Sequence, residues 1–281
     1  MRKTIALILA SCAFAIAAVA QETPQEYYDK YLRLTSRLGY DGVGIETFID
    51  KWEASFPEDG KMLEARCNYF LVKSMQTKAV PKNQNKFLGE APMMTLKDST
   101  GADINYFEEQ FFDDEIFGKA VSCIDKAISI YPSELVYRAD KVSLLLAYEK
   151  ESPDMAVAEI NALIELQKSA HPTWTVDGQP ISADDFASVM SGYCVRLYNV
   201  GSPVAYEAFG KISQDLSKLF PEDSNFLDNI GSYWLVYKDN ERKALKYYRK
   251  ALKINPEDSV AQRNISLIER RREQRKSAKN K

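Results

Sequence analysis

The segment Ala244–Pro256 of this 281-residue chain, ALKYYRKALKINP, sets small residues, an aromatic residue and a proline at fixed offsets along one helix face. The same offsets recur in Ala120–Pro132, AVSCIDKAISIYP. The matching positions are Ala120, Ile124, Ala127 and Pro132 in one segment and Ala244, Tyr248, Ala251 and Pro256 in the other. A short helical unit that recurs in this way buries its apolar face only against neighbouring copies. The repetition therefore predicts an array of stacked helical hairpins.

The tripeptide Pro-Glu-Asp occurs three times, beginning at Pro57, Pro221 and Pro256, and each copy falls between two predicted helices. Phe56 and Phe220 precede the first two copies. We expect the proline in the first turn of the following helix, with the acids near its positive end. Three copies of one joint support the repeat array.

Apolar residues at three- and four-residue steps predict helices along most of the chain. Aromatic and acidic residues that intermingle from Phe107 to Phe117 are interpreted as the two stripes of a helix that leads into the one ending at Pro132. The predicted helices cover residues 22–38, 45–56, 61–76, 107–132, 133–150, 155–170, 182–200, 203–219, 223–238, 244–255 and 257–275.

Two segments interrupt the helical pattern, at about residues 77–106 and at 171–181. In the first, Met93–Leu96 and Ala102–Tyr106 flank the turn sequence Lys97–Gly101, which predicts an inserted β-hairpin. The second contains Asp177-Gly178 as a turn. Long excursions of this kind in compact domains tend to carry function or to be disordered.

The chain resembles tetratricopeptide repeat (TPR) proteins. The best copy runs from Asn225 to Pro256 and carries Leu227, Gly231 and Trp234, then Ala244, Tyr248, Ala251 and Pro256. Gly192 precedes Ala205 by the same thirteen residues that separate Gly231 from Ala244, and Phe209 follows Ala205 by four. The resemblance implies an all-α, right-handed α-solenoid of about five pairs over residues 21–268, with a C-terminal capping helix. The insert, with KFLGEAP and LKDSTG, resembles that of uncharacterised secreted TPR proteins of Gram-negative bacteria.

Members of this family typically bind peptides or helices in a concave groove lined by the first helix of each pair. The resemblance places Asn225, Asp228, Ser232 and Leu235 on that face. Asp228 and Ser232 stand where relatives that grip a C-terminal carboxylate have Lys and Asn, so that ligand is not supported. We therefore expect a non-catalytic scaffold that holds a protein or peptide partner.

The charge of the chain is unevenly distributed. The net charge is −3, or −5 without residues 1–20; Glu269–Lys281 forms a basic tail of +5 and residues 21–268 carry −10. An acidic body argues against nucleic acid as the main partner and favours a basic or neutral one. The basic tail could touch phosphate or an anionic lipid surface, or simply suit the dipole of a solvated helix end.

Residues 1–20 have the pattern of a signal peptide. Arg2 and Lys3 precede an uncharged apolar stretch from Ile5 to Val19, and Ala18-Val19-Ala20 predicts cleavage between Ala20 and Gln21. An alternative is lipidation at Cys12, since Leu9–Cys12 resembles a lipobox, although Cys12 comes very early. We expect an exported protein, periplasmic or on the outer surface of a Gram-negative bacterium, without a stable membrane span after cleavage.

The sequence predicts no catalytic, metal or cofactor site. His171 is the single histidine, and Cys67, Cys123 and Cys194 have no metal-ligand spacing and are expected as buried thiols, with one disulfide as the alternative. Two other functions remain open. A glycan- or nutrient-binding accessory would use an exposed Trp174, and a hydrolase would use a carboxylate pair in a cleft. The adjacent pairs are Glu108/Glu109, Asp113/Asp114 and Asp184/Asp185.

Overall fold

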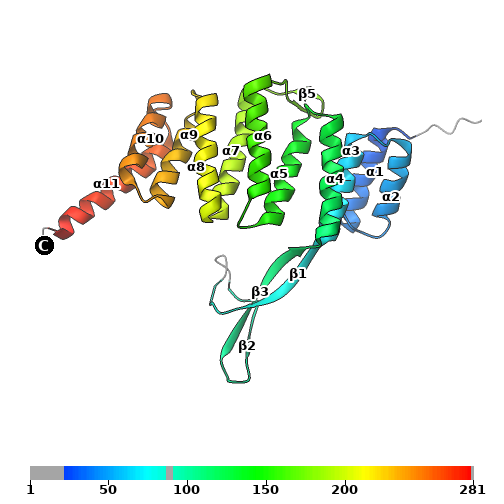
Figure 1. Cartoon of the computed structure of the whole chain (residues 1–281), viewed down its shortest axis with the longest axis horizontal. Helices are drawn as coiled ribbons and strands as arrows, with labels where there is room; N and C mark the ends of the chain where they lie inside the picture. Colours follow the sequence, from blue (N-terminus) through cyan, green and yellow to red (C-terminus); the bar gives the residue numbers. More distant parts are fainter. Residues whose placement is uncertain (1–21, 87–90, 280–281) are drawn as a thin grey trace, which may run out of the picture.

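The computed structural model describes residues 22–86 and 91–279, so the predicted leader and Gln21 lie outside the described residues. Within that range the chain is an all-α solenoid of five antiparallel helical pairs and one additional helix, as the repeats predict (Figure 1). The first helices are α1 (Pro24–Leu38), α3 (Gly60–Ser74), α5 (Leu135–Glu149), α7 (Ala183–Val200) and α9 (Ser224–Ser232). Their partners are α2 (Ile45–Ser55), α4 (Asp114–Ile130), α6 (Asp154–Ala170), α8 (Pro203–Leu219) and α10 (Glu241–Ile254), and α11 (Ser259–Lys279) closes the array.

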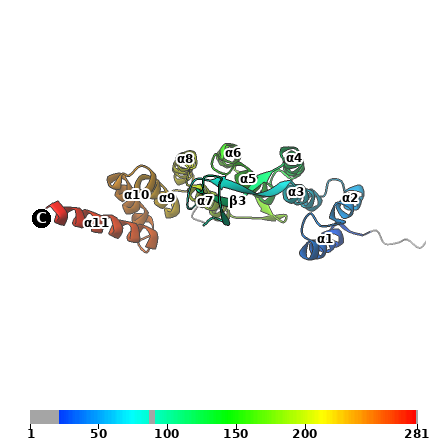
Figure 2. The same ribbon diagram turned by 90° about the horizontal axis from the view of Figure 1, so that it is seen from below.

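The helices form two layers, with the first helices in one and the second helices in the other (Figure 2). A continuous apolar core runs between the layers from Tyr31 to Tyr233, and a smaller cluster around Tyr248 joins α10 to α11. Between α9 and α10 the chain makes a wider π-helical turn, η1 (Tyr233–Tyr237). None of the helices in the described part of the chain is long and apolar enough to span a bilayer.

The three Pro-Glu-Asp joints adopt one geometry. The aspartate N–H donates to the carbonyl three residues earlier, at 3.2 Å for Asp59, 3.2 Å for Asp223 and 3.1 Å for Asp258. Each aspartate then caps the next helix by accepting a backbone N–H, at 3.0, 2.9 and 3.1 Å respectively. The prediction that proline occupies the first helical turn is wrong, because a carboxylate at the N-cap position satisfies the free amides better and leaves the proline in the turn before it.

The first insertion is a three-stranded antiparallel sheet of β1 (Met75–Lys82), β2 (Met94–Lys97) and β3 (Asp103–Phe112), in the order β1-β3-β2. The predicted hairpin is confirmed as β2 and β3. The helix predicted from residue 107 is wrong up to Phe112, because those residues alternate in burial along a strand that β1 pairs from the other side. The insertion therefore extends from 75 to 112 rather than from about 77 to 106.

This ribbon projects from one end of the α3/α4 pair, away from the helical layers (Figure 1). Asp113 N–H donates to the Ser74 carbonyl at 2.8 Å, so the ends of α3 and α4 adjoin as in an ordinary hairpin. At the base of the ribbon, Phe112 packs against Phe117 and Tyr148, each with ring centroids 5.6 Å apart. The insertion thus leaves the helical pair closed beneath it.

The second insertion is a small hairpin, β4 (Thr175–Val176) and β5 (Gln179–Pro180), folded onto the end of α5. The Glu134 carboxylate accepts hydrogen bonds from Thr175 Oγ1 at 2.8 Å, Asp177 N at 2.7 Å and Gly178 N at 3.1 Å. Positive φ at Asp177 and Gly178 gives the tight turn that such a hairpin needs. The hairpin is therefore fixed to the body.

Candidate functional site

A crevice of about 660 Å³ lies between the N-terminal ends of two first helices, α7 and α9. Asp184, Ala187 and Ser188 of α7 form one wall and Asn225 of α9 belongs to the other. The joint that ends in Asp223 lines it as well, with Phe220, Pro221 and Glu222. This crevice has both a first-helix wall and a repeat joint.

The crevice carries negative charge. Asp184, Glu222 and Asp223 line it and no lysine, arginine or histidine does, among the residues that the structure describes. The amides at the helix starts are already engaged, since Ser182 and Asp185 form a capping box on α7 and Asp223 caps α9. The crevice therefore suits a cationic or neutral group and not an anion.

The four predicted partner-binding residues fall in different surroundings. Asn225 is exposed in the crevice, and Ser232 is half-buried with its hydroxyl 3.1 Å from the Tyr248 hydroxyl. Asp228 and Leu235 are 5% and 8% exposed, so the expectation of an open groove face is wrong for these two. Asp228 lies near Asp258 at the start of α11, and Leu235, in η1, packs in the apolar cluster that joins α10 to α11.

Burial changes the protonation state of Asp228. Burial, together with the nearby carboxylate of Asp258, raises the pKa of Asp228 to about 8, and neither oxygen of Asp228 has a hydrogen-bond partner among the described residues. Asp258 caps α11 and accepts the Ser224 hydroxyl at 2.7 Å. Burial alone would raise the pKa of Asp258, but hydrogen bonds from Ser224 and Ala261 hold it below 3.8. Asp228 is thus a protonated structural carboxyl group at neutral pH.

Most of the predicted repeat-packing residues lie at the seams between helices. Ala120, Ile124, Ala127, Ala205, Ala244, Tyr248 and Ala251 are fully buried, as is all but 1% of Phe209. Gly231 lies directly against the Tyr248 ring. Pro132 and Pro256 are exposed and mark the ends of helices rather than contacts. Close helix approach was also expected at Gly192, and this is wrong, because a Cβ there would meet no described atom within 4 Å.

The features that motivated a glycan or catalytic site are differently placed. Trp174 is 4% exposed, stacks on Phe186 at 5.6 Å and donates to Gln167 at 2.7 Å, so its predicted exposure is wrong. His171 is an exposed residue at the end of α6. Glu108 and Glu109 are neighbours on a strand and point to opposite faces. Within residues 22–86 and 91–279 no group of three or more His, Cys, Asp or Glu is placed to hold a metal.

The three cysteines among the described residues have free thiols, with Cys67 and Cys194 buried and Cys123 partly buried. Burial raises the pKa of Cys123 to about 11 and that of Cys194 to about 12. Such thiols are packed as small apolar groups.

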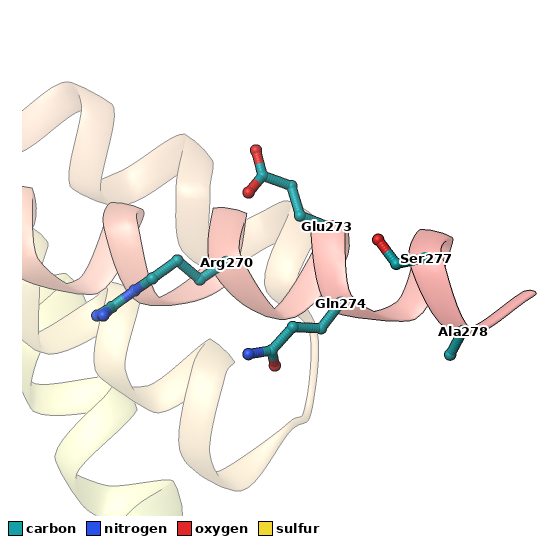
Figure 3. Close-up of a pocket in the computed structure, with 5 residues that line it drawn as sticks. All are labelled: Arg270, Glu273, Gln274, Ser277 and Ala278. Carbon is teal, nitrogen blue, oxygen red and sulfur yellow. The ribbon is translucent and has the colours of Figure 1, made fainter. Parts of the chain in front are cut away.

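The free half of α11 offers only a shallow surface. Arg270, Glu273, Gln274, Ser277 and Ala278 line it, and Figure 3 shows that all five come from this one helix. With no second wall, these side chains do not enclose a ligand.

Sequence reasoning identified Asn225 but missed the crevice as a unit. Its other walls come from α7, about forty residues earlier, from the ends of α8 and α10, and from a joint whose sequence predicts only a repeat boundary. The signal that could have located it is the second Pro-Glu-Asp joint, since a joint and the preceding first helix meet at one end of a solenoid.

No protein-family description matches this sequence, and no curated protein matches it. Similar solved structures include YrrB, described as a TPR protein with an unusual peptide-binding site, at 14% identity and a TM-score of 0.41, covering 87% of this chain and 92% of YrrB. MamA from Desulfovibrio magneticus RS-1 is 13% identical with a TM-score of 0.40, covering 85% and 98%. Yeast Tom70 is 11% identical with a TM-score of 0.43, covering 90% of this chain and 41% of Tom70. TM-scores below 0.5 at such identities define neither a shared site nor a shared ligand.

Proposed function

We propose that this chain is an exported, non-catalytic scaffold of the TPR kind that holds a protein or peptide partner on its first-helix layer. The observation that carries the proposal is the crevice at the N-terminal ends of α7 and α9, which lies beside a repeat joint and is also lined by Leu219 and Ile254, at the ends of the second helices α8 and α10. Its three carboxylates and lack of described cations favour a segment that presents Lys or Arg. An extended peptide fits such a surface, because many modest contacts along stacked helices add up.

The two other functions have less support. The glycan-binding accessory relied on Trp174 as an exposed stacking platform, and that side chain is buried. A carboxylate hydrolase needs one acid in apolar surroundings beside a second in water. Asp184 and Glu222 are both exposed, and Asp223 is engaged as the cap of α9. No pair in the crevice has the required contrast.

The test is a peptide-array screen with the chain lacking residues 1–20. We expect enrichment of basic sequences, and for one selected peptide a fall in affinity of at least about tenfold in the double variant Asp184→Asn, Glu222→Gln. The matched control is Asp29→Asn, Glu58→Gln, which removes the same charge, with Glu58 in the equivalent joint before α3. If both double variants lose affinity for the peptide equally, the effect is one of net charge, and the crevice is not the binding site.

Export has a separate test. The full-length chain, tagged at its C-terminus and expressed in a Gram-negative host, should be recovered from the periplasmic or outer-membrane fraction with Gln21 as its first residue. A mature protein that begins at Cys12 would indicate a lipoprotein and contradict cleavage after Ala20. A chain with an intact N-terminus in the cytoplasm would contradict export.

A further inference from the structure

The C-terminal end of the solenoid has the opposite charge to the rest. From Glu241 to Lys281 there are fourteen Lys and Arg and five Asp and Glu, a net charge of +9. Since the whole chain carries −3, the first 240 residues carry −12. The excess positive charge therefore extends beyond the basic tail Glu269–Lys281 and includes α10.

The positive charge converges on a groove of about 510 Å³ between α10 and α11. Its floor includes the buried Leu245, and its walls carry six cationic side chains: Arg242, Lys246, Arg249, Lys250, Lys253 and, across from them, Arg272. None of these residues belongs to the crevice at α7 and α9. The groove is therefore a second surface with the opposite preference.

Most of this charge is not neutralised internally. Arg272 pairs with Glu241 at 3.1 Å, and Arg249 reaches Glu269 only at 3.8 Å. Arg242, Lys246, Lys250 and Lys253 have no carboxylate within ion-pair distance in the described part of the chain. Placing four unpaired cations side by side costs free energy through repulsion, which a bound polyanion would relieve.

The cations form a line. Arg242, Lys246, Arg249 and Lys253 follow steps of four, three and four along α10, so neighbouring Cβ atoms are roughly 5–6 Å apart. In an extended peptide, side chains on one face repeat about every 6.6 Å. A strand with carboxylates at alternate positions can therefore meet successive cations of this stripe. We propose that the α10/α11 groove binds an acidic, extended polypeptide segment.

Two other anionic partners fit less well. Single-stranded nucleic acid is held by aromatic side chains on which bases stack, and the groove is lined by cations and one leucine. A membrane surface is flat and is usually engaged through exposed apolar residues beside the cations. Among the described residues of α11, one large apolar side chain is exposed. It belongs to Val260, near the start of the helix and away from Arg272. A concave, linear groove without stacking or insertion points favours a carboxylate-bearing chain.

The test uses fluorescence anisotropy with the chain lacking residues 1–20 and a labelled ten-residue peptide of alternating Glu and Ser. Three competitors are compared: a peptide of the same composition with its five Glu in one block, a ten-nucleotide oligothymidylate, and vesicles containing 30% anionic phospholipid. We expect the alternating peptide to bind most tightly, and Lys246→Gln, Lys253→Gln to weaken it at least about tenfold.

The control variant is Arg37→Gln, Lys51→Gln, which removes two exposed cations from α1 and α2 and should change the affinity by less than about twofold. Thermal unfolding of both variants near the wild-type midpoint shows that folding is intact. Equal loss in both variants, tighter binding of the oligonucleotide or the vesicles, no advantage of the alternating peptide over the blocked one, or no binding of any probe would each overturn the proposal.

Discussion

The ring of Tyr248 occupies the space that a side chain at Gly231 would need: a Cβ on Gly231 would lie 2.6 Å from Tyr248 Cε1. The ring cannot move aside easily, because it is fully buried and its hydroxyl is hydrogen-bonded to Ser232. This contact sets how closely α9 and α10 approach.

Substitution Gly231→Ala should therefore destabilise the protein. Overpacking costs about 1–3 kcal/mol and the gain in helix propensity returns about 1 kcal/mol, so a net loss of up to roughly 2 kcal/mol is expected in denaturant unfolding. Gly192→Ala is the matched control, because that position is exposed and open. It should stabilise by about 0.5–1 kcal/mol. If both substitutions stabilise, the close approach at Gly231 is contradicted.

The buried Asp228 predicts a stability that falls as the pH rises. Its pKa is about 8 in the folded state against 3.8 for an ordinary aspartate. The folded state therefore holds the proton more tightly, and stability decreases from about pH 4 to pH 8, where the buried carboxyl must ionise. Asp140, whose pKa burial raises to about 7, acts in the same direction.

The Asp228→Asn variant separates the two groups. It should lose less thermal stability than the wild type between pH 5 and pH 8.5, by at least about 3 °C, while the contribution of Asp140 remains in both. Asp258→Asn is the counterpart: the low pKa of Asp258 means that its stabilisation is present at neutral pH and disappears in acid. Parallel pH curves for wild type and Asp228→Asn would contradict the assignment.

The β-ribbon should be removable without loss of the solenoid. Gln76 and Phe111 face each other in the β1/β3 register, so a two-residue Asn-Gly loop can replace residues 77–110. Phe112 and its contacts with Phe117 and Tyr148 are retained. We expect the circular dichroism signal per helical residue to equal that of wild type. Thermal unfolding should show one cooperative transition with a midpoint within about 4 °C of wild type. A broad or split transition would show that the ribbon supports the core.

The thiols should react in a defined order with a disulfide reagent. Only the thiolate attacks, and burial raises the pKa of all three groups. In the native chain lacking residues 1–20, Cys123 should react first and slowly, with Cys67 and Cys194 protected. In guanidinium chloride, which unfolds the chain, all three thiols should react at once. Rapid native labelling of Cys194 would contradict the buried seam at that position.

The helical pairs could be predicted because their signals are local: a small residue, an aromatic residue four later and an aspartate at each joint. The strand at 107–112 could not, because alternating aromatic and acidic residues satisfy both a helix stripe and a strand face. The deciding partner, β1, lies some thirty residues earlier and contains Pro81. Proline is tolerated there because β1 is an edge strand.

The site residues failed for a different reason. Asp228 is polar, which favours an open face, but the turn that ends in Asp258 lies against it, and contact with a later turn leaves no mark on the sequence of α9 itself. Trp174 was similarly hidden by tertiary packing, since Phe186 lies in the next helix. Asn225 could be placed correctly because it lies two residues after a joint aspartate, in the first turn of its helix.

The uneven division of charge along the solenoid makes the molecule a large permanent dipole. The basic α10 and α11 lie at one end of the long axis, and the acidic portion occupies the rest of its length (Figure 1). Fields from exposed charges decay over about 10 Å at 0.1 M salt, so each end retains its own polarity during an encounter. The rod would thus turn to meet a charged surface or partner end-on, and its approach would be oriented before any side chain touches.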